Sequence, residues 1–348
     1  MTTTRALYFT GPRSLDIREE ALRQPSPGEI LIEAVVSGIS AGTELNVFRG
    51  LAPQWRQKMD PKTRLFSAEG GSTWSWPARY GYAMVGRVAE LGDGVDGLLP
   101  GDLVFAYEPH GDHAVTRASS VIPLGSLAQP ELGVFFANFN TAYNGVLDAN
   151  LPLGADVVVT GLGVIGQIVV RLLKKGGQHT IVAVDGVKRR RDLALAGGAT
   201  HVLDPTKVHV AEAVRDLTGG RGADAVIEVS GAAPALNEAI RIAGYNGLVV
   251  AMSWYGGTFE SLSLSGEFHH NRPRIVSSQV GAVNPFLGPL WSAERRGQLV
   301  REFIDSFAID LSGFITHRVP LADAGRGYRL LDEADPDVVQ MLIDYRRH

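Results

Sequence analysis

The pattern of apolar and polar positions changes character near residue 150. Residues 5–37 and 80–122 carry short apolar runs that alternate with turn residues, which predicts antiparallel β structure in both segments. After residue 150, continuous apolar runs such as 156–160 are each followed by a helical pattern. Because strands buried on both faces have uninterrupted apolar sequences, this second region predicts an α/β fold with a doubly wound parallel sheet.

The last part of the chain shows a mixed pattern. From about residue 285 it predicts a helix over 294–307, a β-like segment over 315–321 and a final helical stretch. A length of 348 residues favours two domains.

Residues 50–79 fit neither pattern and are predicted to form a long ordered loop. Their tryptophans argue against disorder, and a loop of this length in a compact domain is usually functional. Its aromatic side chains suit stacking on a planar or cyclic substrate in a cleft. Its basic side chains either bind an anionic group or are ordinary surface charge. The aromatic residues are Trp55, Trp74 and Trp76, and the basic residues are Arg56, Lys58 and Arg64.

Composition excludes several classes of function. The formal net charge of −4 gives no support for nucleic-acid binding. The chain has no cysteine, so disulfides, thiolate chemistry and cysteine-ligated metals are excluded. The N-terminal sequence lacks the apolar core of a signal peptide, and no apolar run approaches the ~18 residues of a membrane helix. We therefore expect a cytoplasmic protein that acts on a small molecule and binds no membrane.

A glycine-rich loop follows the apolar run 156–160. In its G-x-G-x-x-G pattern, Gly161 makes the tight turn, Gly163 lets the backbone approach a pyrophosphate, and Gly166 lets the helix pack on the strand. The N–H groups at the start of the following helix, which includes Val164 and Ile165, supply an anion site. The context of strand, loop and helix predicts a dinucleotide-binding site.

An acidic residue ends the next predicted strand. Asp185 lies about 20 residues after Gly166, the spacing expected of a carboxylate that binds the adenosine ribose. That role favours NAD, because the carboxylate would repel a 2′-phosphate. Asp185 is alternatively an ordinary turn residue. The basic run 188–191 is either a solvated helix start or, through Arg189 or Arg190, a 2′-phosphate site, so NADP stays open.

Five segments together resemble the medium-chain dehydrogenase/reductase superfamily, in its zinc alcohol dehydrogenase group. They are GISAGTEL (38–45), YGYAMVGRVAELGDGV (80–95), PGDLV (100–104), the glycine loop and ITHRVPL (315–321). The first two are most similar to the branch of bacteriochlorophyllide (hydroxyethyl) dehydrogenase. The resemblance implies a GroES-like catalytic domain over 1–147, a Rossmann domain over 148–282, and a segment 283–348 that completes the catalytic domain.

The resemblance also implies further coenzyme contacts and an oligomeric state. Ser230 is expected near the adenosine half, Ser253 and Trp254 near the nicotinamide, and Ser277 and Ser278 near the carboxamide. The last Rossmann strand often pairs between subunits in this superfamily, so a homodimer is expected.

The zinc site of the superfamily is not matched. Ser40 stands where zinc-dependent relatives carry a cysteine ligand, and Tyr82, in Gly-Tyr-Ala, replaces the histidine of Gly-His-Glu. The four-cysteine zinc lobe is missing. His110 and His113 are spaced for two ligands on one turn, but no third strong ligand is evident. The comparison implies an enzyme without zinc.

Without a metal, hydrogen-bond donors must stabilise the oxygen that gains charge during hydride transfer. Tyr82 and Thr43, at the proton-relay position of the family, are the candidates, with Glu44 or His110 connecting them to solvent. Tyr82 would need a lowered pKa to act as a base; alternatively it is a packed aromatic and Thr43 a turn residue.

The sequence favours an NAD(P)-dependent oxidoreductase for an alcohol/ketone pair, such as a polyol, cyclitol or ring-bearing metabolite. The alternatives are a C=C reductase of the quinone or enone type and an inactive nucleotide-binding protein.

Overall fold

The computed structural model describes residues 2–125, 127, 129–256, 262–306, 309–311 and 313–346. The chain forms two compact units. We call residues 1–137 and 315–348 the terminal unit, and residues 138–314 the central unit. The sequence-based domain bounds at 147 and 282 remain a prediction, and the two units divide the chain at other residues.

The terminal unit contains a seven-stranded sheet in the order β16-β17-β3-β6-β7-β9, with β8 paired to β3. Its strands are β3 (Glu29–Ile39), β6 (Met84–Leu91), β7 (Leu103–Ala106), β8 (His113–Arg117), β9 (Ile122–Pro123), β16 (Ile315–Pro320) and β17 (Gln340–Asp344). A separate hairpin pairs β1 (Thr3–Gly11) with β2 (Ser14–Ala21). The antiparallel strands predicted over 5–37 and 80–122 are present.

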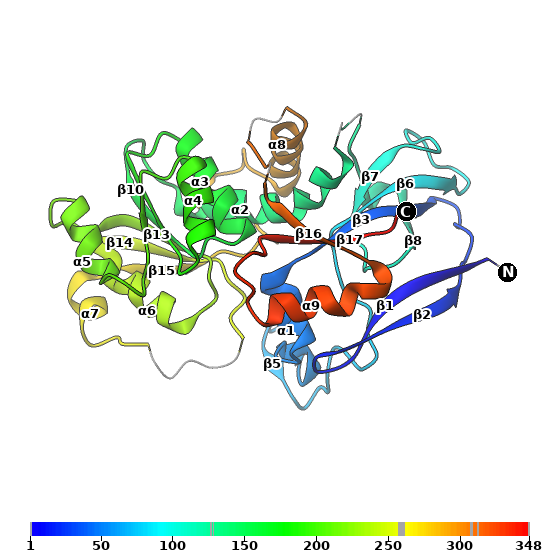
Figure 1. The fold of residues 1–348 in the computed structure, drawn as a ribbon, viewed down its shortest axis with the longest axis horizontal. Helices are drawn as coiled ribbons and strands as arrows, with labels where there is room; N and C mark the ends of the chain where they lie inside the picture. The colour runs from blue at the N-terminus through cyan, green and yellow to red at the C-terminus, as the bar shows by residue number, and fades with distance from the viewer. Residues whose placement is uncertain are drawn as a thin grey trace. The chain divides into compact units, whose positions relative to one another are not determined.

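Apolar side chains on alternate positions form the core of this sheet. Ile30 and Ile32 of β3 pack with Met84 of β6 and Val104 of β7, and all four are fully buried. Helices α1 (Ala41–Phe48) and α9 (Ala324–Asp332) lie side by side next to the sheet (Figure 1). Short helical turns complete the unit: η2 (Ala118–Ser120), η3 (Pro130–Val134) and η5 (Leu321–Asp323).

Residues 50–79 are ordered, but they are not wholly a loop. They contain the turn η1 (Pro53–Trp55) and a small hairpin of β4 (Lys58–Met59) and β5 (Phe66–Ser67). The two strands are too short for the sequence pattern to reveal them.

The central unit is built on a six-stranded parallel sheet in the order β12-β11-β10-β13-β14-β15. The strands are β10 (Asp156–Thr160), β11 (Thr180–Val184), β12 (His201–Leu203), β13 (Ala223–Glu228), β14 (Ala243–Ala251) and β15 (Arg274–Ser277). The order reverses between β10 and β13, as in a Rossmann fold. The predicted fold class, a doubly wound parallel sheet with a β-rich second domain, is confirmed.

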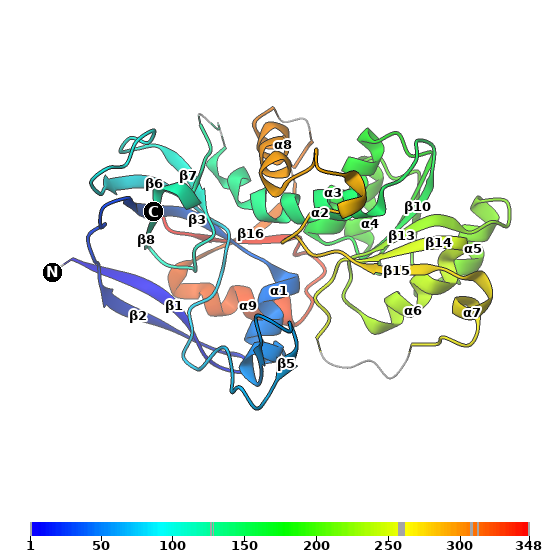
Figure 2. The same cartoon turned by 180° about the vertical axis from the view of Figure 1, so that it is seen from behind.

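Helices cover both faces of this sheet because its strands are apolar on both sides. Figures 1 and 2 show α3 and α6 on opposite faces. Val158, Val226 and Val249 pack toward α5 and α6 in one core cluster. The helices are α2 (Phe135–Ala149), which starts in the terminal unit, α3 (Val164–Lys175), α4 (Lys188–Ala196), α5 (Val210–Leu217), α6 (Ala233–Ile242), α7 (Glu267–Asn271) and α8 (Ala293–Asp305).

Residues 283–314 belong to the central unit because α8 packs on α2. Arg296 is buried and donates to Asn140 Oδ1 at 2.6 Å and to the Val280 carbonyl at 2.7 Å. Phe303 stacks on Phe139 with centroids 5.7 Å apart. The turn η4 (Pro285–Leu287) lies in the same segment. Within the described ranges, every helix is too short or too polar to cross a membrane.

Candidate functional site

The glycine loop joins the end of β10 to the start of α3. Gly161 has φ +88°, and a Cβ there would lie 2.6 Å from the Ser230 backbone. A Cβ on Gly166 would lie 1.9 Å from the Gly161 carbonyl oxygen, so only glycine allows this close packing of helix on loop. Gly163 is the N-cap of α3, Val164 and Ile165 begin the helix, and the space around Gly163 is open. This arrangement leaves room for a pyrophosphate at the helix N-terminus.

Asp185 follows β11 and holds the glycine loop. Its Oδ2 accepts the Leu162 N–H at 2.8 Å, and its Oδ1 accepts the Val187 N–H at 2.8 Å. Arg190 Nη1 lies 3.9 Å from Oδ2, and Arg191 donates to the Asp185 carbonyl at 2.7 Å. The carboxylate is thus fixed at the loop, with the Arg190 guanidinium beside it.

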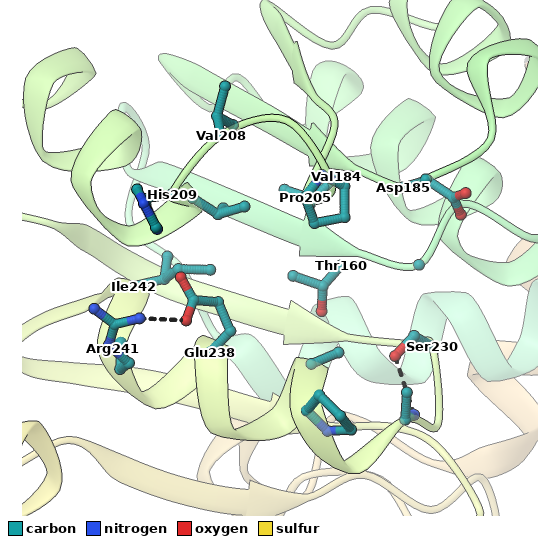
Figure 3. A pocket seen from close by; sticks show the side chains of 16 residues that line it. Thr160, Val184, Asp185, Pro205, Val208, His209, Ser230, Glu238, Arg241 and Ile242 are labelled. Carbon is teal, nitrogen blue, oxygen red and sulfur yellow. Dashed lines mark hydrogen bonds and ion pairs between the residues drawn. The ribbon is translucent and has the colours of Figure 1, made fainter.

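A pocket of about 520 Å³ opens at the carboxyl ends of these strands. Figure 3 shows Asp185 and Ser230 toward one end of the pocket, and His209 and Arg241 toward the other. The buried Thr160 Oγ1 has no hydrogen-bond partner, and its residue lines the pocket. The open glycine cradle, the acidic residue and this orphaned hydroxyl together fit the adenosine half of a dinucleotide.

Of the predicted coenzyme residues, Gly161, Asp185 and Ser230 line this pocket. The Ser230 donors are already used, because its N–H (2.7 Å) and its hydroxyl both donate to Glu228, a fully buried carboxylate. The Tyr255 hydroxyl donates to the same carboxylate. Glu228 and Tyr255 were not predicted, since nothing in their spacing marks them.

The other predicted coenzyme residues lie outside the lining of this pocket. Gly163, Val164, Ile165 and Gly166 belong to the loop and α3, and Arg190 belongs to α4, whereas the four residues expected at the nicotinamide lie at or beyond strand ends. Ser253 and Trp254 follow β14, Ser277 ends β15, and Ser278 comes directly after it. Ser278 is buried, and Asn144 Nδ2 lies 3.4 Å from its hydroxyl. Contacts of these residues with a nicotinamide stay a prediction.

In the terminal unit, Tyr82 belongs to a cluster of hydroxyl groups. Its hydroxyl donates to Ser40 Oγ, and the Thr43 side chain lies close enough to act on the Tyr82 pKa. Burial raises the pKa of Tyr82 to about 12, with a smaller contribution from the charge of Glu44; the bonds from Ser40 and Thr43 oppose this rise. The shift is opposite to the one a base requires, so Tyr82 is a hydrogen-bond donor at neutral pH.

Glu44 and His110 form a buried pair next to this cluster. Both side chains are fully buried, and His110 Nε2 donates to Glu44 Oε2 at 2.9 Å. Glu44 Oε1 accepts the Ser40 N–H at 2.8 Å, and the buried Tyr328 hydroxyl donates to Oε2. The sequence-based hypothesis required Glu44 or His110 to connect the hydroxyl cluster to solvent. Neither side chain is itself exposed to solvent.

A chain of hydroxyls leads from the other side of the histidine. Ser37 Oγ lies 2.7 Å from His110 Nδ1 and 2.8 Å from the Tyr345 hydroxyl. The Tyr345 hydroxyl also accepts the Gly111 N–H at 3.1 Å. The sequence predicted Thr43, Glu44, Tyr82 and His110, and the structure brings these four together. It missed Ser37, Tyr328 and Tyr345, two of which come from the far end of the chain.

The comparisons with known proteins agree on one family. Residues 164–291 match the family model described as zinc-binding dehydrogenase. D-guloside 3-dehydrogenase of Escherichia coli (strain K12) is 29% identical over 351 residues, which cover 98% of this chain and 100% of that protein. Over almost its whole length the chain is similar to dehydrogenases of the medium-chain dehydrogenase/reductase superfamily, as the sequence predicted.

Two further dehydrogenases extend this comparison. 2-Desacetyl-2-hydroxyethyl bacteriochlorophyllide A dehydrogenase of Rhodobacter capsulatus is 27% identical and covers 99% of this chain and 98% of its own. The crystal structure of a dehydrogenase of Sinorhizobium meliloti 1021, bound to NADP, has a TM-score of 0.78 at 20% identity and covers 99% and 100% of the two chains. The predictions of the superfamily, of an NAD(P)-dependent oxidoreductase and of a nicotinamide coenzyme are confirmed.

Zinc, which the family model implies, does not fit the side chains of the terminal unit. The oxygens of Glu44 and both ring nitrogens of His110 are engaged by protein groups. His113 bonds instead to Thr4 Oγ1 at 3.1 Å. In the described part of the chain, no three His, Cys, Asp or Glu side chains gather as a metal site. Hydroxyls are poor zinc ligands compared with thiolate or imidazole.

Proposed function

We propose that this protein interconverts a secondary hydroxyl and a ketone on a polyol or a ring-bearing metabolite, without zinc. The observation that carries the proposal is the hydroxyl cluster of Tyr82, Ser40 and Thr43, at positions where zinc-dependent relatives hold a ligand and the proton relay. The name of the relative D-guloside 3-dehydrogenase supports a sugar-like substrate.

When bound, the nicotinamide coenzyme supplies the hydride acceptor or donor. Tyr82 donates a hydrogen bond to the reacting oxygen and stabilises the negative charge that develops there. In the reduction direction its phenol proton moves to that oxygen, and the hydroxyls of Ser40 and the partly exposed Thr43 relay a proton from water to replace it, because a phenolate with a pKa of about 12 does not persist. In the oxidation direction the same hydroxyls relay the substrate proton to water.

Glu44 and His110 act as positioning residues in this proposal. Glu44 Oε1 fixes the backbone N–H of Ser40, and Ser40 in turn accepts from Tyr82. His110 and Tyr328 supply the donors that a fully buried carboxylate needs. The pair therefore sets the position of the hydroxyl cluster, and neither side chain exchanges protons with water directly.

For the coenzyme, we propose a preference for NAD. Asp185 presents a carboxylate at the ribose end of the pocket, and a 2′-phosphate would be repelled by it. Arg190 lies beside that carboxylate, 3.9 Å from Oδ2. We further propose a homodimer that pairs through β15, the edge strand of the central sheet, on which Ile275 is 39% exposed. The cytoplasmic location stays a prediction.

The test follows a deuterium label from the nicotinamide C4 position into the product. Incubation with a panel of sugar ketones, polyol ketones and enones should place deuterium on a carbinol carbon. Full activity after dialysis against a chelator, with substoichiometric zinc by elemental analysis, should accompany it. Label on a β-carbon would instead support the C=C reductase, and no turnover on either panel would support the inactive nucleotide-binding protein. Stoichiometric zinc required for turnover would refute the metal-free mechanism.

A further inference from the structure

A continuous row of aromatic side chains leads from Tyr82 into the segment 50–79. The ring centroids of Tyr82 and Tyr80 are 6.2 Å apart, those of Tyr80 and Trp74 5.3 Å, and those of Trp74 and Trp55 5.3 Å. Trp76 closes the row by stacking on Trp55 at 3.6 Å. We call these five side chains the aromatic row; it begins at the hydroxyl proposed to act on the substrate.

Unused polar atoms accompany the aromatic row at its far end. Gln54 Oε1 and Trp55 Nε1 are both buried and have no hydrogen-bond partner. A buried polar atom without a partner is costly, and in a native structure it calls for an explanation. One of these atoms is an acceptor and the other a donor, on adjacent residues. Both atoms are covered by neighbouring side chains, so a ligand reaches them only when those side chains move; a ligand that offers both a donor and an acceptor would then satisfy them together.

The backbone holds this end of the row in place. The Gln54 carbonyl accepts the N–H of Thr73 at 2.9 Å and of Trp74 at 3.1 Å, which joins the two arms of the segment. Thr73 Oγ1 also donates to the Gln57 carbonyl at 3.2 Å. The backbone that carries these groups is therefore preorganised, which lowers the entropy cost of binding a ligand.

We propose that the aromatic row binds a disaccharide-type glycoside, with the oxidised sugar ring at Tyr82 and Tyr80 and the second sugar ring at Trp74 and Trp55. This inference rests on the proposed function and names its substrate class. Sugar rings present C–H faces that pack on aromatic rings, and hydroxyls that both donate and accept. A purely apolar ring would leave Gln54 Oε1 and Trp55 Nε1 unsatisfied. A single sugar ring bound at Tyr82 leaves the Trp55 end uncovered.

The experiment compares matched substrates with one and two rings. Wild-type enzyme is assayed with methyl β-D-glucopyranoside against cellobiose, with methyl α-D-glucopyranoside against maltose, and with open-chain sorbitol. Gln54→Leu removes one of the orphaned atoms and keeps the side-chain bulk, and Trp55→Phe removes the other together with one ring of the indole. We expect each variant to lower kcat/KM for the disaccharide about tenfold, as loss of one hydrogen bond does, and to leave the methyl glycoside unchanged.

The melting temperature of the variants separates a ligand subsite from a purely structural role of these side chains. The atom that Gln54→Leu removes has no partner in the free protein, so the melting temperature of this variant should stay constant or rise. The control Leu65→Ala alters an exposed side chain of the same segment outside the row and should change neither quantity. Equal losses for both substrate types, no loss for either, or a lower melting temperature with unchanged kinetics would overturn the subsite.

A binding readout keeps the subsite distinguishable from the proposed function. Cellobiose or maltose should quench tryptophan fluorescence of the wild type, and Trp74→Phe and Gln54→Leu should weaken that titration. Quenching without oxidation of any sugar would support the subsite and refute the proposed reaction. Oxidation of sorbitol or methyl glycosides, with no quenching and no preference for two rings, would support the reaction and refute the subsite.

Discussion

Replacing Tyr82 with phenylalanine removes one oxygen atom and tests the proposed chemistry directly. That hydroxyl donates to Ser40 Oγ, and burial, with a smaller contribution from the charge of Glu44, raises its pKa to about 12. At pH 7 the ionised fraction is therefore on the order of 10⁻⁵. The phenol is a donor at every pH used in an ordinary assay, and the substitution deletes a donor, not a base.

The magnitude follows from what a preorganised donor contributes. Loss of one such donor to a developing oxyanion typically lowers kcat by about 10²- to 10³-fold. Stability should change far less, because the folded protein loses one hydrogen bond worth about 1 kcal/mol. Coenzyme affinity should not change, because the glycine loop and Asp185 lie in the central unit.

The assay is steady-state reduction of the ketone with NADH, combined with a fluorescence titration of NADH and a urea unfolding curve. Tyr8→Phe is the matched control, since it removes a hydroxyl that donates to Glu20 in the β1–β2 hairpin of the same unit. At pH values below 10, ionisation of a tyrosine should cause no fall in the wild-type kcat. Full turnover by Tyr82→Phe, or a loss shared equally by Tyr8→Phe, would refute the reasoning.

Three further predictions concern binding and stability. Asp185→Ala removes the acceptor of the Leu162 N–H in the glycine loop and of the Val187 N–H at the start of α4, and should raise the Kd for NADH at least tenfold, measured by fluorescence; unchanged affinity would contradict its role. His110→Ala leaves the buried carboxylate of Glu44 without one donor and should lower the free energy of unfolding in urea by about 3 kcal/mol while NADH affinity stays constant. Because the pKa of Tyr82 is raised to about 12 in the folded state, the unfolded chain ionises first as pH increases. Stability should be level below pH 10 and fall between pH 10 and about 12 by up to about 3 kcal/mol from this group, and Tyr82→Phe should show a shallower fall in urea titrations.

The sequence predicted the central sheet because its signals are local. The runs at β10, β11 and β13 are short, apolar and bounded by turn residues, and each is followed by a helical pattern. The prediction of a final helical stretch was incomplete, since α9 is followed by the strand β17. Residues 340–344 are buried at every position, and such a run does not distinguish a strand from a buried helix without knowledge of its neighbours.

The sequence predicted only those site residues that a short motif or the family pattern specifies. Thr43 and Glu44 follow from one motif, and Tyr82 and His110 follow from positions in the family pattern. Tyr328 reaches Glu44 across a long stretch of sequence, and nothing in the residues around it indicates that contact. The same holds for Gln54 and Trp55, because only coordinates show that their polar atoms lack partners.

The place of β17 has a consequence for biosynthesis. This strand lies between β16 and β3, at the interior of the terminal sheet, and Tyr345 just beyond it bonds to Ser37. A ribosome releases residues 138–314 before it releases this strand, so the central unit is able to fold while β3 still lacks one neighbour. During that interval β3 offers unpaired backbone groups to other nascent chains. Premature termination shortly before residue 340 would make this exposure permanent.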